Sequence, residues 1–175
     1  IELYTYEGDG WTASWGGGGS WEGHVEQVPG PDRNEQDFYQ TGLNLTFGNF
    51  AVGGVFEYYN DALDRSGEGG DVGDPVVDDA WVAGAGIAYT IDAWVIGAQY
   101  AHLDANGNGD SATTDLTQDR AMLIGAYSLG PGIVIDGEIA YTWADTDPEG
   151  GETADGTDID DYDALEIGLG TAITF

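Results

Sequence analysis

The sequence predicts an all-β fold, specifically an antiparallel transmembrane β-barrel. Bulky apolar residues alternate with small or polar ones in segment after segment, which is the pattern of a strand with two unlike faces. The connections between these segments alternate between short turns and long acidic stretches, as in barrels that cross a membrane. The sequence contains no run of about 18 apolar residues, so it predicts no transmembrane helix.

Nine strands are expected along the chain. The first two, residues 1–7 and 11–16, flank a turn at Gly8-Asp9-Gly10. The other seven are expected at residues 39–47, 50–59, 81–91, 94–103, 121–129, 133–143 and 165–175. The alternation is clearest in the last strand, where Leu165 and Ile167 lie opposite Glu166 and Gly168. Residues 121–129 are apolar on both faces, so the sequence leaves their orientation open.

Short and long connections alternate between these strands. Tight-turn residues occur at positions 8–10, 48–49, 92–93 and 130–132. Long, polar and acidic connections are expected at about residues 16–38, 61–79, 104–119 and 144–161. The short turns recur at intervals of about 40 residues, which indicates a repeated unit of strand, turn, strand and loop.

Aromatic residues gather near the two ends of the strands. Trp11, Phe50 and Trp94 directly follow short turns. A second group lies where strands meet long connections: Tyr58, Tyr59, Trp81, Tyr100, Tyr141, Trp143 and Tyr162. Two such bands match the aromatic girdles at the two membrane interfaces. The alternative, a soluble β-sandwich that binds carbohydrate through exposed Trp, would concentrate its aromatics in mid-strand instead.

The composition argues against several partners. The net charge is −30, with 33 acidic residues and three basic ones, so the chain cannot neutralise the phosphates of a nucleic acid. It also lacks the basic patch that docking on an anionic membrane surface requires. Cysteine is absent, which leaves no disulfide framework and no thiolate metal site.

Several motifs point to one family. They are the segments WVAGAGIAY at 81–89, WVIGAQY at 94–100, SLGPGI at 128–133 and IGLGT at 167–171. These resemble the hairpins of Gram-negative outer-membrane porins, especially the general diffusion porins of alphaproteobacteria. Phe175, at the end of an alternating strand, resembles the membrane-insertion signal of outer-membrane barrels. The resemblance covers most of the chain from Tyr39 onward and implies a 16-stranded barrel, a passive channel and a homotrimer.

An odd number of strands needs an explanation, because bacterial single-chain barrels have an even number. We therefore expect residues 1–175 to form a single β-barrel domain that is the C-terminal portion of a longer barrel. The alternative merges the first two strands and gives a small closed eight-stranded barrel with a structural or adhesion role. The turn signal at Gly8-Asp9-Gly10 favours the first interpretation.

If the bulky face meets lipid, the polar residues of the strands point inward. The predicted pore-lining residues are Gln40, Asn44, Glu57, Gln99, Asp136, Glu138 and Glu166. Charge in hydrocarbon costs up to about 2–4 kcal/mol, so these side chains need a wet interior. An acidic interior concentrates cations, which predicts a cation-preferring channel for small hydrophilic solutes. Alternatively, Asp136 and Glu138 pair with Arg from strands outside this sequence, which would leave little net field.

One acidic segment has the spacing of a calcium-binding loop. Its candidate Ca²⁺ ligands are Asp104, Asn106, Asn108, Asp110 and Asp115. Position twelve is Asp115 rather than the usual Glu, and a plain acidic loop is the alternative interpretation. The acidic connections also offer carboxylates for divalent cations shared with lipopolysaccharide phosphates. No other cofactor is expected.

No enzymatic activity is predicted. The chain contains two histidines, His24 and His102, and neither lies in a recognisable nucleophile motif. Carboxylates are so abundant that a catalytic pair of them carries no information.

Overall fold

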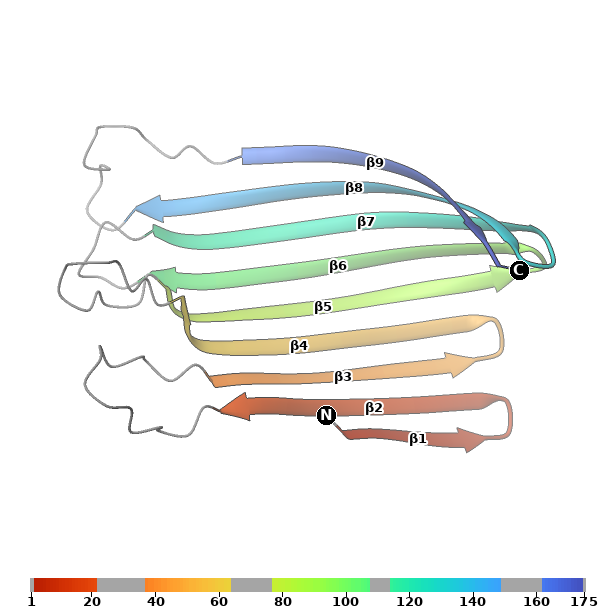
Figure 1. Ribbon diagram of the computed structural model, residues 1–175, viewed down its shortest axis with the longest axis horizontal. Coiled ribbons are helices and arrows are strands. Elements are labelled where there is room, and N and C mark those ends of the chain that lie inside the picture. Colours follow the sequence, from red (N-terminus) through yellow and green to blue (C-terminus); the bar gives the residue numbers. More distant parts are fainter. Residues whose placement is uncertain (1, 22–36, 64–76, 108–113, 149–161, 175) are drawn as a thin grey trace.

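The protein forms one antiparallel sheet of nine strands in the computed structural model, which describes residues 2–21, 37–63, 77–107, 114–148 and 162–174 (Figure 1). The strands are β1 (Glu2–Gly8), β2 (Trp11–Trp21), β3 (Asp37–Phe47), β4 (Phe50–Leu63), β5 (Val77–Ile91), β6 (Trp94–Gly107), β7 (Thr114–Gly130), β8 (Ile133–Pro148) and β9 (Tyr162–Ile173). Each strand pairs with its neighbours in chain order, so the sheet is a meander with β1 and β9 at its edges. The described residues thus form nine strands, and β1 and β2 are separate strands, which rejects the merging of the first two.

The short turns form where the sequence predicts them, because residues there adopt positive φ angles. Gly10, Gly48 and Gly132 have φ values of 80°, 56° and 79°. Asp92 has a φ of 50°, a conformation that Asp tolerates better than most residues. Adjacent turns are also hydrogen-bonded to each other or to the neighbouring strand end, as between the Gly48 N–H and the Gly10 carbonyl at 3.3 Å.

The strands are longer than predicted at their other ends, so the predicted long connections are wrong in their bounds. β2 continues to Trp21, β6 continues to Gly107, and β7 already begins at Thr114. The reason is that hydrophobic alternation marks a strand only where its two faces meet different environments. At the strand ends away from the short turns, neither face is consistently apolar, so the hydrophobic alternation is lost. The main-chain hydrogen bonds between the strands continue there. Phe175, predicted to end the last strand, lies outside the described residues.

The sheet has almost no core. Among the described residues only Ala140, Ala144 and Thr142 are buried. Ile167 and Leu169 are 75% and 85% exposed, and they belong to a large set of exposed aliphatic and aromatic side chains. A protein dissolved in water would cover these side chains with a second layer, and the nine strands form a single sheet instead. The soluble β-sandwich is therefore rejected.

The two faces of the sheet differ, and the strand register assigns each residue to one of them. Directly paired residues share a face. We define the apolar face by the row that crosses the sheet through Leu45, Val52, Ile87, Ala98, Leu123, Ile139 and Ile167, and by the residues on the same side. The polar face carries the row Asn44, Gly53, Gly86, Gln99, Met122, Ala140 and Glu166. The register thus orients residues 121–129, which the sequence left open.

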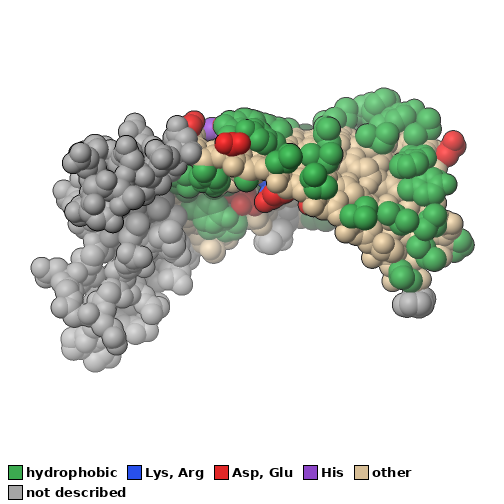
Figure 2. All heavy atoms as spheres, turned by 90° about the horizontal axis from the view of Figure 1, so that it is seen from above, with side chains coloured by type: hydrophobic (Ala, Val, Ile, Leu, Met, Phe, Trp, Pro, Cys, Tyr) green, Lys and Arg blue, Asp and Glu red, His purple; other side chains and the backbone are tan. Residues whose placement is uncertain are grey.

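Figure 2 shows how these faces lie in space. Hydrophobic side chains spread over the upper surface of the arched sheet, and a group of acidic and basic side chains lies beneath it. None of the described segments is a helix long and apolar enough to cross a membrane.

Candidate pore-lining face

All seven residues predicted to line a pore lie on the polar face. Asn44, Gln99 and Glu166 share one row, although they come from β3, β6 and β9. Gln40 and Glu57 pair directly with each other, two polar-face rows further from the short turns. Asp136 and Glu138 follow each other on β8 towards the short turns. The residues are spread across the wall and do not converge on one point, as expected for a lining and not for an enclosed binding site.

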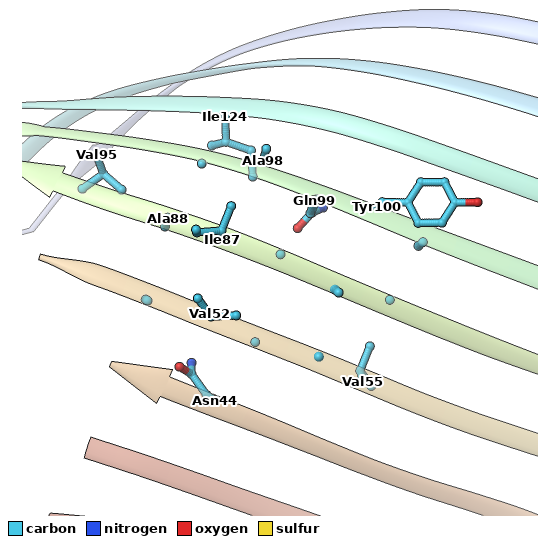
Figure 3. Close-up of a pocket in the computed structure, with 18 residues that line it drawn as sticks. Asn44, Val52, Val55, Ile87, Ala88, Val95, Ala98, Gln99, Tyr100 and Ile124 are labelled. Carbon is cyan, nitrogen blue, oxygen red and sulfur yellow. The ribbon is translucent and has the colours of Figure 1, made fainter. Parts of the chain in front are cut away.

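The middle of the polar face is a shallow hollow of about 560 Å³ (Figure 3). Its floor consists largely of residues with little or no side chain, including Gly53, Gly84, Gly86 and Gly97. Asn44 and Gln99 carry the amide groups at this hollow. Because glycine adds nothing above the backbone, β4, β5 and β6 leave the space on this side open.

On the polar face, two side-chain contacts form a polar bridge that joins β7 to β9 across β8. The Arg120 Nη2 donates to the Glu166 Oε2 at 2.6 Å, so a side chain of β7 reaches one of β9. Further from the short turns, the Tyr162 hydroxyl donates to the Gln118 Oε1 at 3.3 Å, so a second contact also joins β9 to β7. Between them lie the buried β8 residues named above, whose small side chains leave room for both bridges.

Sequence reasoning missed this bridge. Arg120 falls one residue before the strand predicted at 121–129. The sequence places Tyr162 in the group of aromatics at the strand ends next to the long connections, which we call the outer aromatic band. The register places Tyr162 and Tyr59 on the polar face, which corrects two members of that band. Tyr59 instead donates to the Glu57 Oε2 at 2.9 Å. Extending the alternation backward from Leu123 would have placed Arg120 on the same face as Glu166.

The polar face carries more negative than positive charge. Its described acidic side chains are Glu7, Glu57, Asp136, Glu138 and Glu166, and its described basic side chain is Arg120. The carboxylates of Asp136 and Glu138 lie over β9, where two glycines make room for them. A Cβ added at Gly170 would be 2.8 Å from the Asp136 Oδ2, and one at Gly168 would be 2.9 Å from the Glu138 Cγ. In the described part of the chain Arg120 pairs with Glu166 and with neither of these two.

The apolar face ends in a row of polar contacts at the end opposite the short turns. The Trp15 Nε1 donates to the Thr41 Oγ1 at 3.0 Å, and the Tyr141 hydroxyl donates to the Asp163 Oδ2 at 3.0 Å. In each contact the aromatic ring stays beside apolar residues while its polar atom points to the next row. Aromatic side chains at a membrane interface have this arrangement.

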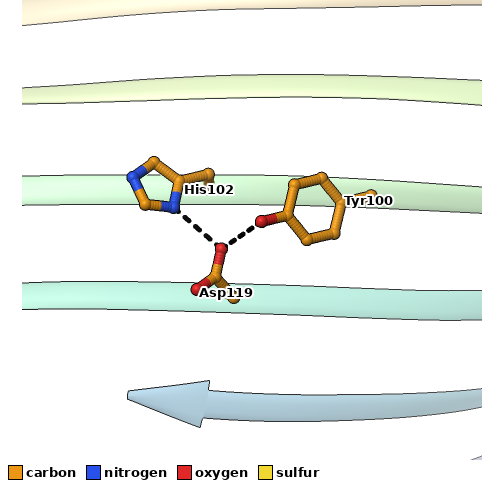
Figure 4. Close-up of polar contacts among 3 residues, drawn as sticks. All are labelled: Tyr100, His102 and Asp119. Carbon is orange, nitrogen blue, oxygen red and sulfur yellow. Dashed lines mark hydrogen bonds and ion pairs between the residues drawn. The ribbon is translucent and has the colours of Figure 1, made fainter. Parts of the chain in front are cut away.

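A third contact of this kind includes the one described histidine (Figure 4). The Tyr100 hydroxyl donates to the Asp119 Oδ1, which also lies 2.8 Å from the His102 Nδ1. The His102 ring packs against Trp81, with ring centroids 4.9 Å apart. His102 is thus held in the outer aromatic band, away from the polar face. His24, the other histidine, lies outside the described residues.

The candidate calcium ligands are only partly described. Asp104 and Asn106 lie in β6 and Asp115 lies in β7, while Asn108 and Asp110 fall outside the described residues. The Asn106 Nδ2 donates to both Asp79 carboxylate oxygens at 3.2 Å. The described residues contain no group of three acidic or histidine side chains placed to hold a metal ion. The calcium site stays a prediction.

Comparison with known proteins identifies the family. The model of the family described as Gram-negative porin matches residues 4–147. The chain belongs to the Gram-negative porin family. No curated protein sequence matches this porin significantly.

A solved structure shows the same fold. It is OmpTdeltaL8, a loop L8 deletion mutant of OmpT, an outer membrane protein of Vibrio cholerae, to which this porin aligns with a TM-score of 0.65 and 19% identity. The alignment covers 99% of this chain and 51% of that one, so the porin chain spans about half the length of that protein. The porin is accordingly an outer-membrane protein whose strands have the arrangement of a barrel wall.

Proposed function

We propose that this porin forms part of the wall of a passive, water-filled channel for small hydrophilic solutes, with a preference for cations. The observation that carries the proposal is the separation of the two faces. The exposed aliphatic face suits lipid, and the opposite face holds five described carboxylates and one guanidinium. A wet lumen with excess negative charge concentrates cations and repels anions, and no chemical step is needed.

We further propose that residues 1–175 supply the C-terminal portion of a longer barrel. The described strands leave β1 and β9 as edges that do not contact each other. An open edge with unpaired main-chain groups is unfavourable in a membrane, so additional strands are needed to close the sheet. The half-length match to the Vibrio cholerae protein supports this proposal. A 16-stranded barrel assembled as a homotrimer is the arrangement we expect.

The surroundings of the channel follow from the same charge pattern. Carboxylates of the apolar face such as Asp119 and Asp163 accept hydrogen bonds from tyrosines of the outer aromatic band. This band lies at the level where we expect the headgroups of the outer leaflet to begin. We propose that divalent cations link acidic groups of the porin to lipopolysaccharide phosphates. Adding a chelator to purified native complexes should release bound lipopolysaccharide if this holds, and leave it bound if the contact is purely apolar.

The first test is planar-bilayer recording of the full-length protein, purified from outer membranes, under a KCl gradient. We expect large conductance steps that close in threes and a reversal potential that favours K⁺. Folded protein that gives no steps would contradict the channel, and a reversal potential that favours Cl⁻ would contradict the cation preference.

A second test assigns the lumen to the polar face. The sequence contains no cysteine, so single cysteines can be introduced cleanly. Gln99→Cys on the polar face should react with a charged, water-soluble methanethiosulfonate and reduce the conductance. Ala98→Cys, its neighbour on the apolar face, is the matched control and should not react. Equal reaction at both positions would contradict the assignment of the two faces.

A further inference from the structure

We propose that Arg120 limits the cation preference of the channel, because it holds Glu166 against the wall in a neutral pair. This inference rests on the proposed function and names the residue that tunes it. The Arg120 Nη2 and the Glu166 Oε2 are 2.6 Å apart, which is the short distance of a charge-assisted hydrogen bond.

The wall fixes the position of this pair. β7 and β9 are not neighbours in the sheet, so the two side chains must cross β8 to meet. They cross it above Ala140 and Thr142, which are 0% and 6% exposed. The second bridge, from Tyr162 to Gln118, lies beside the first and crosses Ala144. Both charged groups of the pair therefore lie along the sheet, although their side chains remain 39% and 53% exposed.

Pairing divides the acidic groups of the wall into two classes. Glu166 is compensated by Arg120, whereas Glu7, Glu57, Asp136 and Glu138 have no cationic partner among the described residues. A cation that passes the wall is thus attracted by these four carboxylates, of which Asp136 and Glu138 lie nearest the pair, on β8 towards the short turns. Removing the guanidinium would release Glu166 and add one negative charge to this set.

The experiment is the reversal potential of the full-length porin under a KCl gradient. Arg120→Gln should raise the permeability ratio of K⁺ to Cl⁻ about sevenfold, because a unit charge roughly 7 Å away in water favours K⁺ and disfavours Cl⁻ by about 2.7-fold each. Glu166→Gln should lower the ratio by a similar factor, because it leaves Arg120 uncompensated. The exchanged pair Arg120→Glu with Glu166→Arg should keep the wild-type ratio, and so should Arg120→Lys.

Two control variants separate this inference from the proposed function. Glu138→Gln removes an uncompensated carboxylate from the polar face and should lower the ratio. Asp145→Asn, at a position that pairs with Thr117 on the apolar face, makes the same charge change and should leave the ratio unaltered. If Glu138→Gln changes the ratio and Arg120→Gln does not, the inference about Arg120 is wrong and the channel proposal stands. If neither variant has an effect, the polar face does not line the ion path and both fail. An effect of Asp145→Asn as large as that of Arg120→Gln would show that only total charge matters, and would overturn the inference.

The exchanged pair keeps the test decisive if a single variant does not assemble. It retains both charges and the contact between β7 and β9. A ratio that shifts in the exchanged variant as far as in the single ones would show that the two groups do not compensate each other.

Discussion

Placing a charge at Ile87 tests the orientation of the sheet most directly. Ile87 lies on the apolar face of β5, and its side chain is 49% exposed in the protein alone. The apolar face of β5 runs from Trp81 to Ile91, ten residues along the strand. A strand rises about 3.3 Å per residue and tilts by roughly 40°, so these residues span about 25 Å of membrane depth. Ile87 is four residues from Ile91, about 10 Å above the lower end and therefore close to the midplane.

The expected cost follows from this depth. Arginine at the midplane of a lipid-facing strand costs about 2–4 kcal/mol, whereas near an interface the cost falls to about 0–1 kcal/mol. We expect Ile87→Arg to lower the free energy of unfolding by about 3 kcal/mol, roughly a hundredfold in the folding equilibrium. Ile91→Arg, at the lower end of the same strand face, should cost less than about 1 kcal/mol.

The assay is equilibrium unfolding of the full-length porin from lipid vesicles in denaturant, followed by tryptophan fluorescence. The matched control is Ala88→Arg, one residue along the same strand but on the polar face. Its neighbours across the sheet, Ala51 and Gly97, are small and leave space for the longer side chain. A cost for Ala88→Arg as large as that for Ile87→Arg would refute the assignment of the faces. Equal costs at Ile87 and Ile91 would refute the depth argument.

Three further predictions concern stability. Gly132→Ala should cost about 1–3 kcal/mol, since its φ is 79° and an added Cβ would collide with the Thr174 carbonyl oxygen. Gly125→Ala, where an added Cβ would have nothing within 4 Å, should be near neutral, and similar unfolding midpoints for the two variants would contradict this. Thr41→Val removes the acceptor of the Trp15 Nε1 and should cost about 0.5–1.5 kcal/mol in the same assay, accompanied by a shift in tryptophan emission. Arg120→Gln should cost less than about 1 kcal/mol, because its side chain is 39% exposed and exposed ion pairs contribute little. A loss above about 2 kcal/mol would show that the bridge is mainly structural.

The sequence predicted the short turns and the two-faced strands because both depend on neighbouring residues. The turns at Gly10, Gly48 and Gly132 require positive φ, and glycine is the residue that adopts it without strain. Alternation places every second residue on one face, and this local rule was enough to assign all seven predicted lining residues to the polar face. The rule fails where the two faces are alike, which is why the strand ends beyond the apolar band were assigned to loops.

The contacts between distant strands could be seen only in the folded sheet. Arg120 and Glu166 are separated by 46 positions and by a whole strand between them. Their meeting depends on the register of β7 with β8 and of β8 with β9, and on small side chains at Ala140 and Thr142. Likewise, only the folded sheet showed that Tyr162 reaches Gln118 across β8 and that Tyr100 reaches Asp119. The sequence by itself determined which face the strands present wherever the alternation is clear, because that follows from a period of two, and it left only residues 121–129 open. The tertiary structure decided which charges cancel, because register and strand order bring together residues that no local pattern connects.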